Sequence, residues 1–342
     1  MNRILLIQLR QLGDILLTTP AIRAVRRAYP HAQLDFLTHR MGKMILANNP
    51  DLNHLWTYHE DESWLQQGRL MQALKRQRYD CIIDFMYNPR SALMAWWTKA
   101  PQRIAFESRR SWAYTDVVSS PTTTEYIVRE KFHLLKFLGI PPVEERLILP
   151  WHEKDSTIVG KFAKKEPAFG ESKCRVIISA THRREIRQWP VERYAQIADR
   201  LQNEWGAAVT WIWGPGEEKI VESGMSFCSR PMLKAPATSF GELAALIANS
   251  DLFLGNSNGP SHVAVSADTC SLQLHGPTLA KAWCPLNERH MAIQAKRMED
   301  ITVDEVWRKL RSLKPEVEKK SKSRRSIGVR MNWKQTHEPI PY

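Results

Sequence analysis

The chain has few cysteines, no glycine-rich phosphate loop and no long hydrophobic run. Its five cysteines are widely spread and none forms a C-x-x-C pair, which argues against a disulfide framework or a zinc site and favours buried thiols in a reducing compartment. Neither a Walker loop nor a G-x-G-x-x-G motif is present. Any nucleotide would therefore be held by helix ends and arginines.

Membrane-spanning and secretion signals are also lacking. The most apolar short run, 92–97, is far below the ~20 residues that a membrane span needs. The apolar start of the chain is interrupted at Gln8 and Arg10, and no small-residue cleavage site follows, unlike a signal peptide. We therefore expect a cytoplasmic protein.

Positive charge is in excess. The 342 residues carry a net charge of +13, which suits nucleic acid, an anionic membrane surface or an acidic substrate. One basic block, 90–110, is interleaved with aromatic residues, and a second lies in the polar segment after residue 314. We expect this C-terminal segment to be a mobile basic tail.

Strand-like and helix-like segments alternate along the chain. The expected strands are 4–9, 33–38, 81–85, 103–106, 175–179, 208–213, 251–254 and 270–274. The expected helices are 15–29, 65–77, 91–97, 130–138, 190–205, 217–225, 240–249, 261–267 and 302–313. This β/α alternation predicts an α/β protein with parallel sheets covered on both faces. A proline-containing, weakly periodic zone at 141–173 indicates a linker, giving domains 1–160 and 161–313 and a tail 314–342.

The stretch 9–20, L-R-Q-L-G-D-I-L-L-T-T-P, organises the first half. It places Gly13 and Asp14 in the turn beyond the first strand, where ligands bind in open α/β sheets. Asp14 is therefore a candidate general base for an alcohol. Asp is also a favoured N-cap, and the local pattern alone favours the capping role.

Three loops of the second half are candidates for binding an anion. The loop 181–190, T-H-R-R-E-I-R-Q-W-P, puts three arginines before a helix, a phosphate-binding arrangement or a solvated basic loop. In 255–265, Asn258 or Gly259 can cap a helix with Pro260 in its first turn, and His262 either contacts a ligand or is structural. In 213–218, the acidic side chains of Glu217 and Glu218 either reach the hydroxyls of a ribose or only occupy the first turn of a helix.

These segments together resemble one family. The opening L-R-Q-L-G-D-I-L-L-T-T-P-A-I-R-A-V-R-R-A-Y-P, the middle R-Q-W-P and the late N-G-P-S-H-V-A…H-G-P-T are similar to those of the ADP-heptose:lipopolysaccharide heptosyltransferases, glycosyltransferase family 9. The resemblance covers about residues 3–313. It implies a GT-B architecture, in which two Rossmann-like domains face each other across a cleft, the N-terminal domain taking the acceptor and the C-terminal domain the sugar nucleotide.

The same resemblance implies the chemistry and the residues that carry it. The reaction is an inverting displacement without a catalytic metal or cofactor, with ADP-heptose as donor and Asp14 as general base. The residues that match donor-binding positions are Thr181, His182, Arg187, Glu217, Glu218, Thr238, Ser257, Asn258, Gly259 and His262. Arg10, Gly13 and Arg90 are candidates for the acceptor. Arg187 replaces the family's Lys and Ser257 replaces its Asp, which leaves the donor sugar and the core position open.

The resemblance also implies the partners. The acceptor is a lipopolysaccharide inner core, and the block 90–114 would rest on the anionic cytoplasmic face of the inner membrane, although a solvated face with core tryptophans explains its composition as well. A related transferase using another sugar nucleotide for surface polysaccharide is the first alternative. A non-catalytic nucleic-acid-binding protein is a remote one, because no binding motif of that class is present.

Overall fold

The structure is a computed structural model that describes residues 1–330. It divides into two compact units, unit 1 (Met1–Ile148) and unit 2 (from Leu149 on). The division falls inside the zone 141–173, twelve residues before the boundary expected after residue 160.

Unit 1 contains a six-stranded parallel sheet in the order β3-β2-β1-β4-β5-β6. Its elements are β1 (Arg3–Ile7), α1 (Leu12–Leu16), α2 (Thr19–Ala28), β2 (Gln33–His39), α3 (Lys43–Leu46), β3 (His54–Tyr58), α4 (Trp64–Arg76), β4 (Cys81–Asp84), α5 (Pro89–Thr98), β5 (Gln102–Phe106), β6 (Asp116–Val118) and α6 (Ile127–Lys136).

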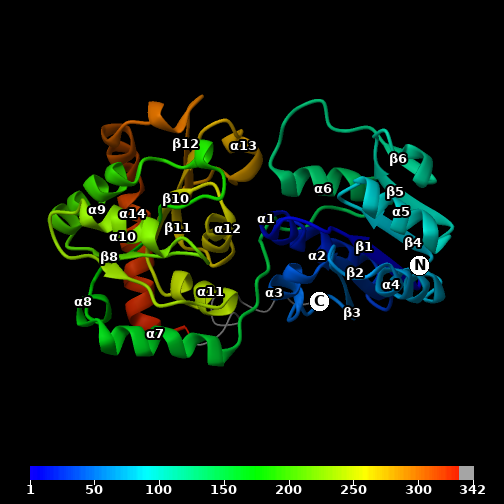
Figure 1. The fold of residues 1–342 in the computed structure, drawn as a ribbon, viewed down its shortest axis with the longest axis horizontal. Helices are drawn as coiled ribbons and strands as arrows, with labels where there is room; N and C mark the ends of the chain where they lie inside the picture. Colours follow the sequence, from blue (N-terminus) through cyan, green and yellow to red (C-terminus); the bar gives the residue numbers. More distant parts are fainter. Residues whose placement is uncertain (331–342) are drawn as a thin grey trace. The chain divides into compact units, whose positions relative to one another are not determined.

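Unit 2 contains a second six-stranded parallel sheet, in the order β12-β11-β10-β7-β8-β9. Its elements are α7 (Glu153–Lys165), α8 (Pro167–Gly170), β7 (Arg175–Ser179), α9 (Val191–Trp205), β8 (Ala208–Trp211), α10 (Glu218–Ser226), β9 (Leu233–Lys234), α11 (Phe240–Ala248), β10 (Leu252–Asn256), α12 (Gly259–Ser266), β11 (Cys270–His275), α13 (Ala280–Trp283), β12 (His290–Gln294) and α14 (Val303–Ile327). In Figure 1, α9 and α10 lie on one side of these strands and α11 and α12 on the other.

Both units are therefore parallel α/β layers, as the alternation predicts. The central strands are continuous apolar runs because helices cover both of their faces. Leu5 and Ile7 of β1 pack in one core, and Val176 and Ile178 of β7 pack in the other.

In the segment 15–29, Thr19 and Pro20 predict either a kink in one helix or the start of a second, and the structure has two helices. Thr18 is the N-cap of α2 and Pro20 lies in its first turn, where its missing N–H costs nothing. The Thr19 hydroxyl donates to the Leu16 carbonyl at 2.7 Å and accepts from the Ile148 N–H at 2.8 Å. This break separates the Asp14 segment, α1, from α2.

Several elements were missed from the sequence. The strands β3, β6, β9 and β12 are short, and their residues are mostly half-buried or exposed, so their apolar pattern is weak. The helix α7 lies within the zone expected to be linker. Only a narrow stripe that includes Val159 and Phe162 is buried there, in a segment that otherwise reads as charged.

The mobile tail expected from residue 314 is wrong up to residue 327. The helix α14 continues through Pro315 to Ile327, and the remainder of the expected tail, 331–342, lies outside the described residues. Val317 packs in the core of unit 2, while Lys320 and Arg324 are buried and paired instead of solvated.

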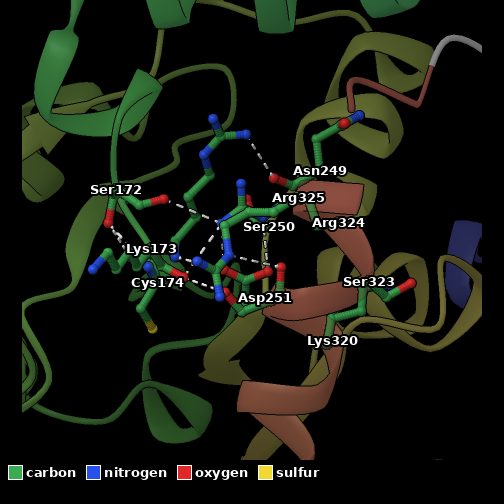
Figure 2. Close-up of polar contacts among 12 residues, drawn as sticks. Ser172, Lys173, Cys174, Asn249, Ser250, Asp251, Lys320, Ser323, Arg324 and Arg325 are labelled. Atoms are coloured by element: carbon green, nitrogen blue, oxygen red, sulfur yellow. Dashed lines mark hydrogen bonds and ion pairs between the residues drawn. The ribbon is translucent and has the colours of Figure 1, made fainter. Parts of the chain in front are cut away.

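Polar contacts attach this last part of α14 to the start of the sheet (Figure 2). Arg324 donates to both carboxylate oxygens of Asp251, at 2.8 and 2.9 Å, and both side chains are almost fully buried. Asp251 also accepts from the Arg175 N–H at 2.8 Å. Lys320 donates to the carbonyls of Ala267 and Asp268 at the C-terminal end of α12, where a cation is favourable.

Candidate functional site

Each sheet has a switch point where the chain reverses direction across the sheet. In unit 1 the chain winds outward from β1 to β3 and then from β4 to β6, so the switch lies between β1 and β4. In unit 2 it lies between β7 and β10. Ligands of open α/β sheets bind beyond the strand ends at such points. Asp14 follows β1, and the loops 180–190 and 257–259 follow β7 and β10, so the structure puts the main candidates at the two switches.

Asp14 lies in α1, and it is not the residue that caps the helix. Gln11 is the N-cap, and the Asp14 carboxylate accepts from the Gln11 backbone N–H at 3.1 Å. In this capping box the Gln11 side chain in turn accepts from the Asp14 N–H, and the two bonds hold the Asp14 side chain close to the end of β1. The carbonyl of Gly13, two positions after the cap, accepts from the Leu17 N–H at 2.9 Å.

Burial raises the pKa of Asp14 above that of a free aspartate, while the positive charge of Lys131 and the Gln11 N–H act in the opposite direction. Lys131 comes from α6, and it is buried. Burial lowers the pKa of Lys131, while Asp14, Glu130 and Asp84 oppose that shift. Lys131 was not predicted from the sequence. It is the cation that tunes the candidate base.

The two acceptor candidates after β1 and β4 come together. Arg10 and Arg90 both reach Glu60, Arg10 through a hydrogen bond and Arg90 at 3.7 Å. The guanidinium of Arg90 also stacks over the Tyr58 ring at 4.7 Å. Two exposed cations share one carboxylate, so the group of Arg10, Arg90 and Glu60 has a net positive charge. Glu60 was not among the predicted residues.

Other members of the basic block 90–114 have structural tasks. The side chain of Arg103 donates to the Ala113 carbonyl at 2.8 Å. The Tyr114 hydroxyl is buried and donates to Asp84 at 2.7 Å. Asp84 in turn accepts from the Met86 and Tyr87 N–H groups. This part of the block shapes the turn after β4.

In unit 2, the loop after β7 gathers positive charge without an acidic partner. No ion pair within residues 1–330 involves Arg183, Arg184 or Arg187. The Nε of Arg187 is buried and, among the described residues, has no hydrogen-bond partner. Burial and the two neighbouring arginines lower the pKa of Arg187. An anion bound here would relieve both the repulsion and the unsatisfied donor.

His182 lies in the same loop and is held by its backbone. Its Nδ1 accepts from the Arg184 N–H at 2.9 Å, and its own N–H donates to the Gln188 side chain at 3.2 Å. Burial lowers the pKa of His182, with the Arg184 carbonyl opposing and Arg187 adding to the shift. The ring is therefore neutral near pH 7.

The two loops at this switch are tied together by asparagines. Asn258, the N-cap of α12, accepts from the Ser261 N–H and donates to the Ser179 hydroxyl at 3.0 Å and the Thr181 carbonyl at 3.1 Å. Asn256 donates to the Ala180 carbonyl at 2.9 Å and accepts from the Trp189 N–H at 3.0 Å. Asn256 was not singled out from the sequence, although it lies in the same G-N-S-N-G-P segment.

The N-terminal turn of α12 is open where a ligand would need space. A Cβ on Gly259 would meet nothing within 4 Å, and Ser257 is half-buried beside it. By contrast, a Cβ on Gly255 would lie 2.8 Å from the Ser179 carbonyl oxygen, so β7 and β10 approach each other too closely for a side chain there. The backbone N–H groups at the start of α12 suit an anion.

The three remaining donor candidates follow β8 and β9. Glu217 accepts from the Thr181 hydroxyl at 2.6 Å and from the Gly214 N–H at 2.9 Å, which joins the loops after β7 and β8. Glu218 is engaged elsewhere, in an ion pair with Lys234 at 2.8 Å. Thr238 is half-buried just before α11. Thr181, His182, Glu217 and Asn258 therefore form one connected group, and Glu218 points to a different partner.

His262 is buried inside the first turn of α12 and belongs to a polar cluster that the sequence did not reveal. Its Nδ1, both ring nitrogens of His275 and both amide atoms of Gln273 have no hydrogen-bond partner among the described residues. Burial lowers the pKa of His262 to about 4 and that of His275 to about 3. Both rings are therefore neutral at physiological pH.

Residues 1–330 contain no group of three or more His, Cys, Asp or Glu side chains placed to hold a metal ion. Within the same range, no helix combines the length and apolar character needed to cross a bilayer.

Comparisons with known proteins place this geometry in a family. The model of glycosyltransferase family 9 (heptosyltransferase) matches residues 67–309. Lipopolysaccharide heptosyltransferase 3 of Escherichia coli K12 is 26% identical over 296 residues, covering 82% of this chain and 84% of the relative. The lipopolysaccharide core heptosyltransferase OpsX of Haemophilus influenzae is 22% identical over 277 residues, covering 79% of this chain and 78% of the relative.

Solved structures agree on the fold. A family 9 glycosyl transferase from Veillonella parvula superposes with a TM-score of 0.81 at 19% identity, covering 91% of this chain and 97% of that one. The ADP-heptose heptosyltransferase II of E. coli gives a TM-score of 0.74 at 19% identity, covering 92% and 98%. The predicted GT-B class is confirmed. The chain belongs to glycosyltransferase family 9, the heptosyltransferases, and is a glycosyltransferase.

Proposed function

We propose that this protein transfers a heptose from ADP-heptose to the inner core of lipopolysaccharide, by an inverting displacement in which Asp14 is the general base. The observation that carries the donor half is the buried Arg187 Nε, which has no hydrogen-bond partner among the described residues, in the loop that Asn258 ties to the open N-terminus of α12. The names of relatives support the substrates, since these include lipopolysaccharide heptosyltransferases. One structural neighbour, the heptosyltransferase WaaC of E. coli, was solved with ADP-2-deoxy-2-fluoro heptose.

In this proposal, unit 2 holds the donor. Arg187 and the N–H group of Gly259, at the positive end of α12, neutralise the diphosphate as negative charge builds on the leaving ADP. Thr181, His182 and Asn258 line the same switch point, and Glu217 or Thr238 contacts the nucleoside. Ser257, just before the N-cap of α12, and His262, in its first turn, complete the proposed donor site. No metal or cofactor has a part in the proposal.

Unit 1 supplies the base and the acceptor site. The acceptor hydroxyl oxygen forms the new bond to the anomeric carbon, the bond from that carbon to the diphosphate oxygen breaks, and the hydroxyl proton passes to Asp14. The positive charge of Lys131 opposes the rise that burial causes in the pKa of Asp14. Arg10, Gly13 and Arg90 border the acceptor, whose phosphates and carboxylates are attracted by the positive charges of Arg10 and Arg90. The acceptor's lipid anchor places the reaction at the cytoplasmic face of the inner membrane.

The test is transfer from purified ADP-heptose to defined core acceptors, read by mass. We expect Asp14→Asn to lower the transfer rate by about 10²- to 10⁴-fold, with ADP affinity and melting temperature unchanged. Asp61→Asn, at an exposed aspartate of the same unit, is the matched control. Wild-type rates in Asp14→Asn would refute the base assignment.

Ser257 supports a second candidate. A serine in place of the family's aspartate removes a carboxylate from the donor loop, which favours a related transferase with a different sugar nucleotide. A donor panel separates the two: turnover with another sugar nucleotide and none with ADP-heptose would establish the second candidate.

A further inference from the structure

Unit 1 carries a groove between α4 and α5, and the proposed acceptor residues Arg10, Gly13 and Arg90 are not among those that line it. Its volume is about 690 Å³, and its walls are apolar side chains of the two helices with two arginines among them. Helix α4 contributes Trp64, Leu65 and Met71 to the lining, and helix α5 contributes Leu93 and Trp96. The two helices pack against each other and are seen beside the same sheet in Figure 1.

Part of the apolar lining faces water, while Met71 and Trp96 pack against the core of unit 1. Trp64 is 79% exposed, and Leu65 and Leu93 are also exposed. Trp112, 61% exposed, extends the surface, since its ring lies 6.2 Å from that of Trp96. Exposed apolar patches of this kind mark interaction sites, and indole rings are favoured where one end is apolar and the other wet.

The groove also has a positive rim. Arg69 and Arg76 line it. Lys99 lies 3.8 Å from the ring centroid of Trp96, and Lys75 lies 5.3 Å from that of Trp97. Among residues 1–330, no acidic side chain lines the groove. The occupant should therefore be anionic as well as apolar.

We propose that the α4–α5 groove is the surface by which the protein docks on an anionic lipid bilayer. Tryptophans at headgroup depth and basic side chains beside them are the combination that such a surface binds. Gly68 leaves the middle of the groove open, because a Cβ there would meet nothing within 4 Å. The inference rests on the proposed function for its biological reason, a lipid-anchored acceptor, while its geometry is independent of catalysis.

Flotation of the full chain with phospholipid vesicles tests the proposal. We expect binding to phosphatidylethanolamine vesicles that contain phosphatidylglycerol, weakening with salt, and little binding to pure phosphatidylcholine. Each basic residue near the surface contributes about fivefold, so Arg69→Gln with Arg76→Gln should weaken binding by roughly 25-fold. Trp64→Ser should cost about tenfold or more through lost apolar contact.

A glycine pair supplies the matched control. Gly68→Glu adds a negative charge in open space inside the groove and should abolish flotation by repulsion from the lipid. Gly160→Glu makes the same change in α7, where a Cβ also meets nothing within 4 Å, and should bind as the parent does. Equal flotation of the two variants, or equal binding of the parent to both vesicle types, would overturn the proposal. The proposal would also be overturned if analytical ultracentrifugation showed that the protein self-associates, and if the groove variants dissociated that species without changing flotation.

Transfer assays keep this inference separate from the proposed function. Gly68→Glu should transfer normally to a delipidated, soluble core acceptor and poorly to the same core embedded in anionic vesicles. If the parent fails with every acceptor yet floats with anionic lipid, the proposed function fails and the docking surface stands. If the parent transfers but Gly68→Glu is equally active in both formats, the docking surface fails.

Discussion

The buried ion pair between Arg324 and Asp251 should hold the C-terminal half of α14 on unit 2. In Arg324→Ala the Asp251 carboxylate loses two hydrogen bonds and its ion-pair partner, and keeps the hydrogen bond from the Arg175 N–H. Removing one member of a buried pair leaves an uncompensated charge and costs about 3–5 kcal/mol. That is a large part of the ~5–15 kcal/mol by which a domain is stable.

The chain offers an internal and an external control. Hydrogen exchange followed by mass spectrometry reports the opening free energy of each unit separately, so peptides of unit 1 should be unchanged. Arg200 pairs with Asp304 at 2.9 Å on the surface of unit 2, and Arg200→Ala should cost only about 0–1 kcal/mol. The double variant Arg324→Met with Asp251→Asn removes both charges and should recover most of the loss.

The reasoning is refuted if β10 peptides of Arg324→Ala exchange no faster than those of Arg200→Ala. The end of α14 would then contribute no more than a surface helix does, as the sequence alone suggested.

Three further outcomes are expected. Lys131→Met should move the acid limb of the pH profile of kcat/KM to higher pH, because the cation holds the pKa of Asp14 down against burial; an unmoved limb would show that Lys131 is not the tuning charge. Arg187→Gln should weaken ADP binding in calorimetry by about 10- to 100-fold through a lost charged hydrogen bond, while Arg308→Gln on the exposed side of α14 should not. Burial lowers the pKa of His275 to about 3, so below about pH 6.5 only the unfolded chain takes up the proton, and the free energy of unfolding falls between pH 7 and pH 5. His275→Leu removes this contribution and should make that fall smaller by about 2 kcal/mol. An unchanged pH dependence in urea unfolding would contradict that last account.

The central strands and most helices could be predicted because their signal is local. Apolar runs such as 175–179 are continuous only when helices cover both faces, and Asn258 with Pro260 indicates a helix start. The same alternation predicts that Asp14 and Asn258 lie just beyond the ends of strands, as they do in the structure.

What the sequence did not show depends on partners distant in the chain. Lys320 and Arg324 occupy buried positions of α14 that hydropathy assigns to solvent, and only the carbonyls of α12 and the Asp251 carboxylate make that burial possible. Lys131 lies on a helix far from Asp14 in sequence. Glu60 follows β3, an edge strand too exposed to be recognised.

The pairing of Asp251 with Arg324 also bears on how the chain matures. The two residues are 73 positions apart, and at about 5–20 residues per second the ribosome needs about 4 to 15 s to reach the second after the first. All of unit 1 is synthesised before either, so it can reach its native state while translation continues. In unit 2 the Asp251 carboxylate must wait without Arg324 until the final turns of α14 emerge, which makes that interval the period in which chaperones have most reason to engage the nascent protein.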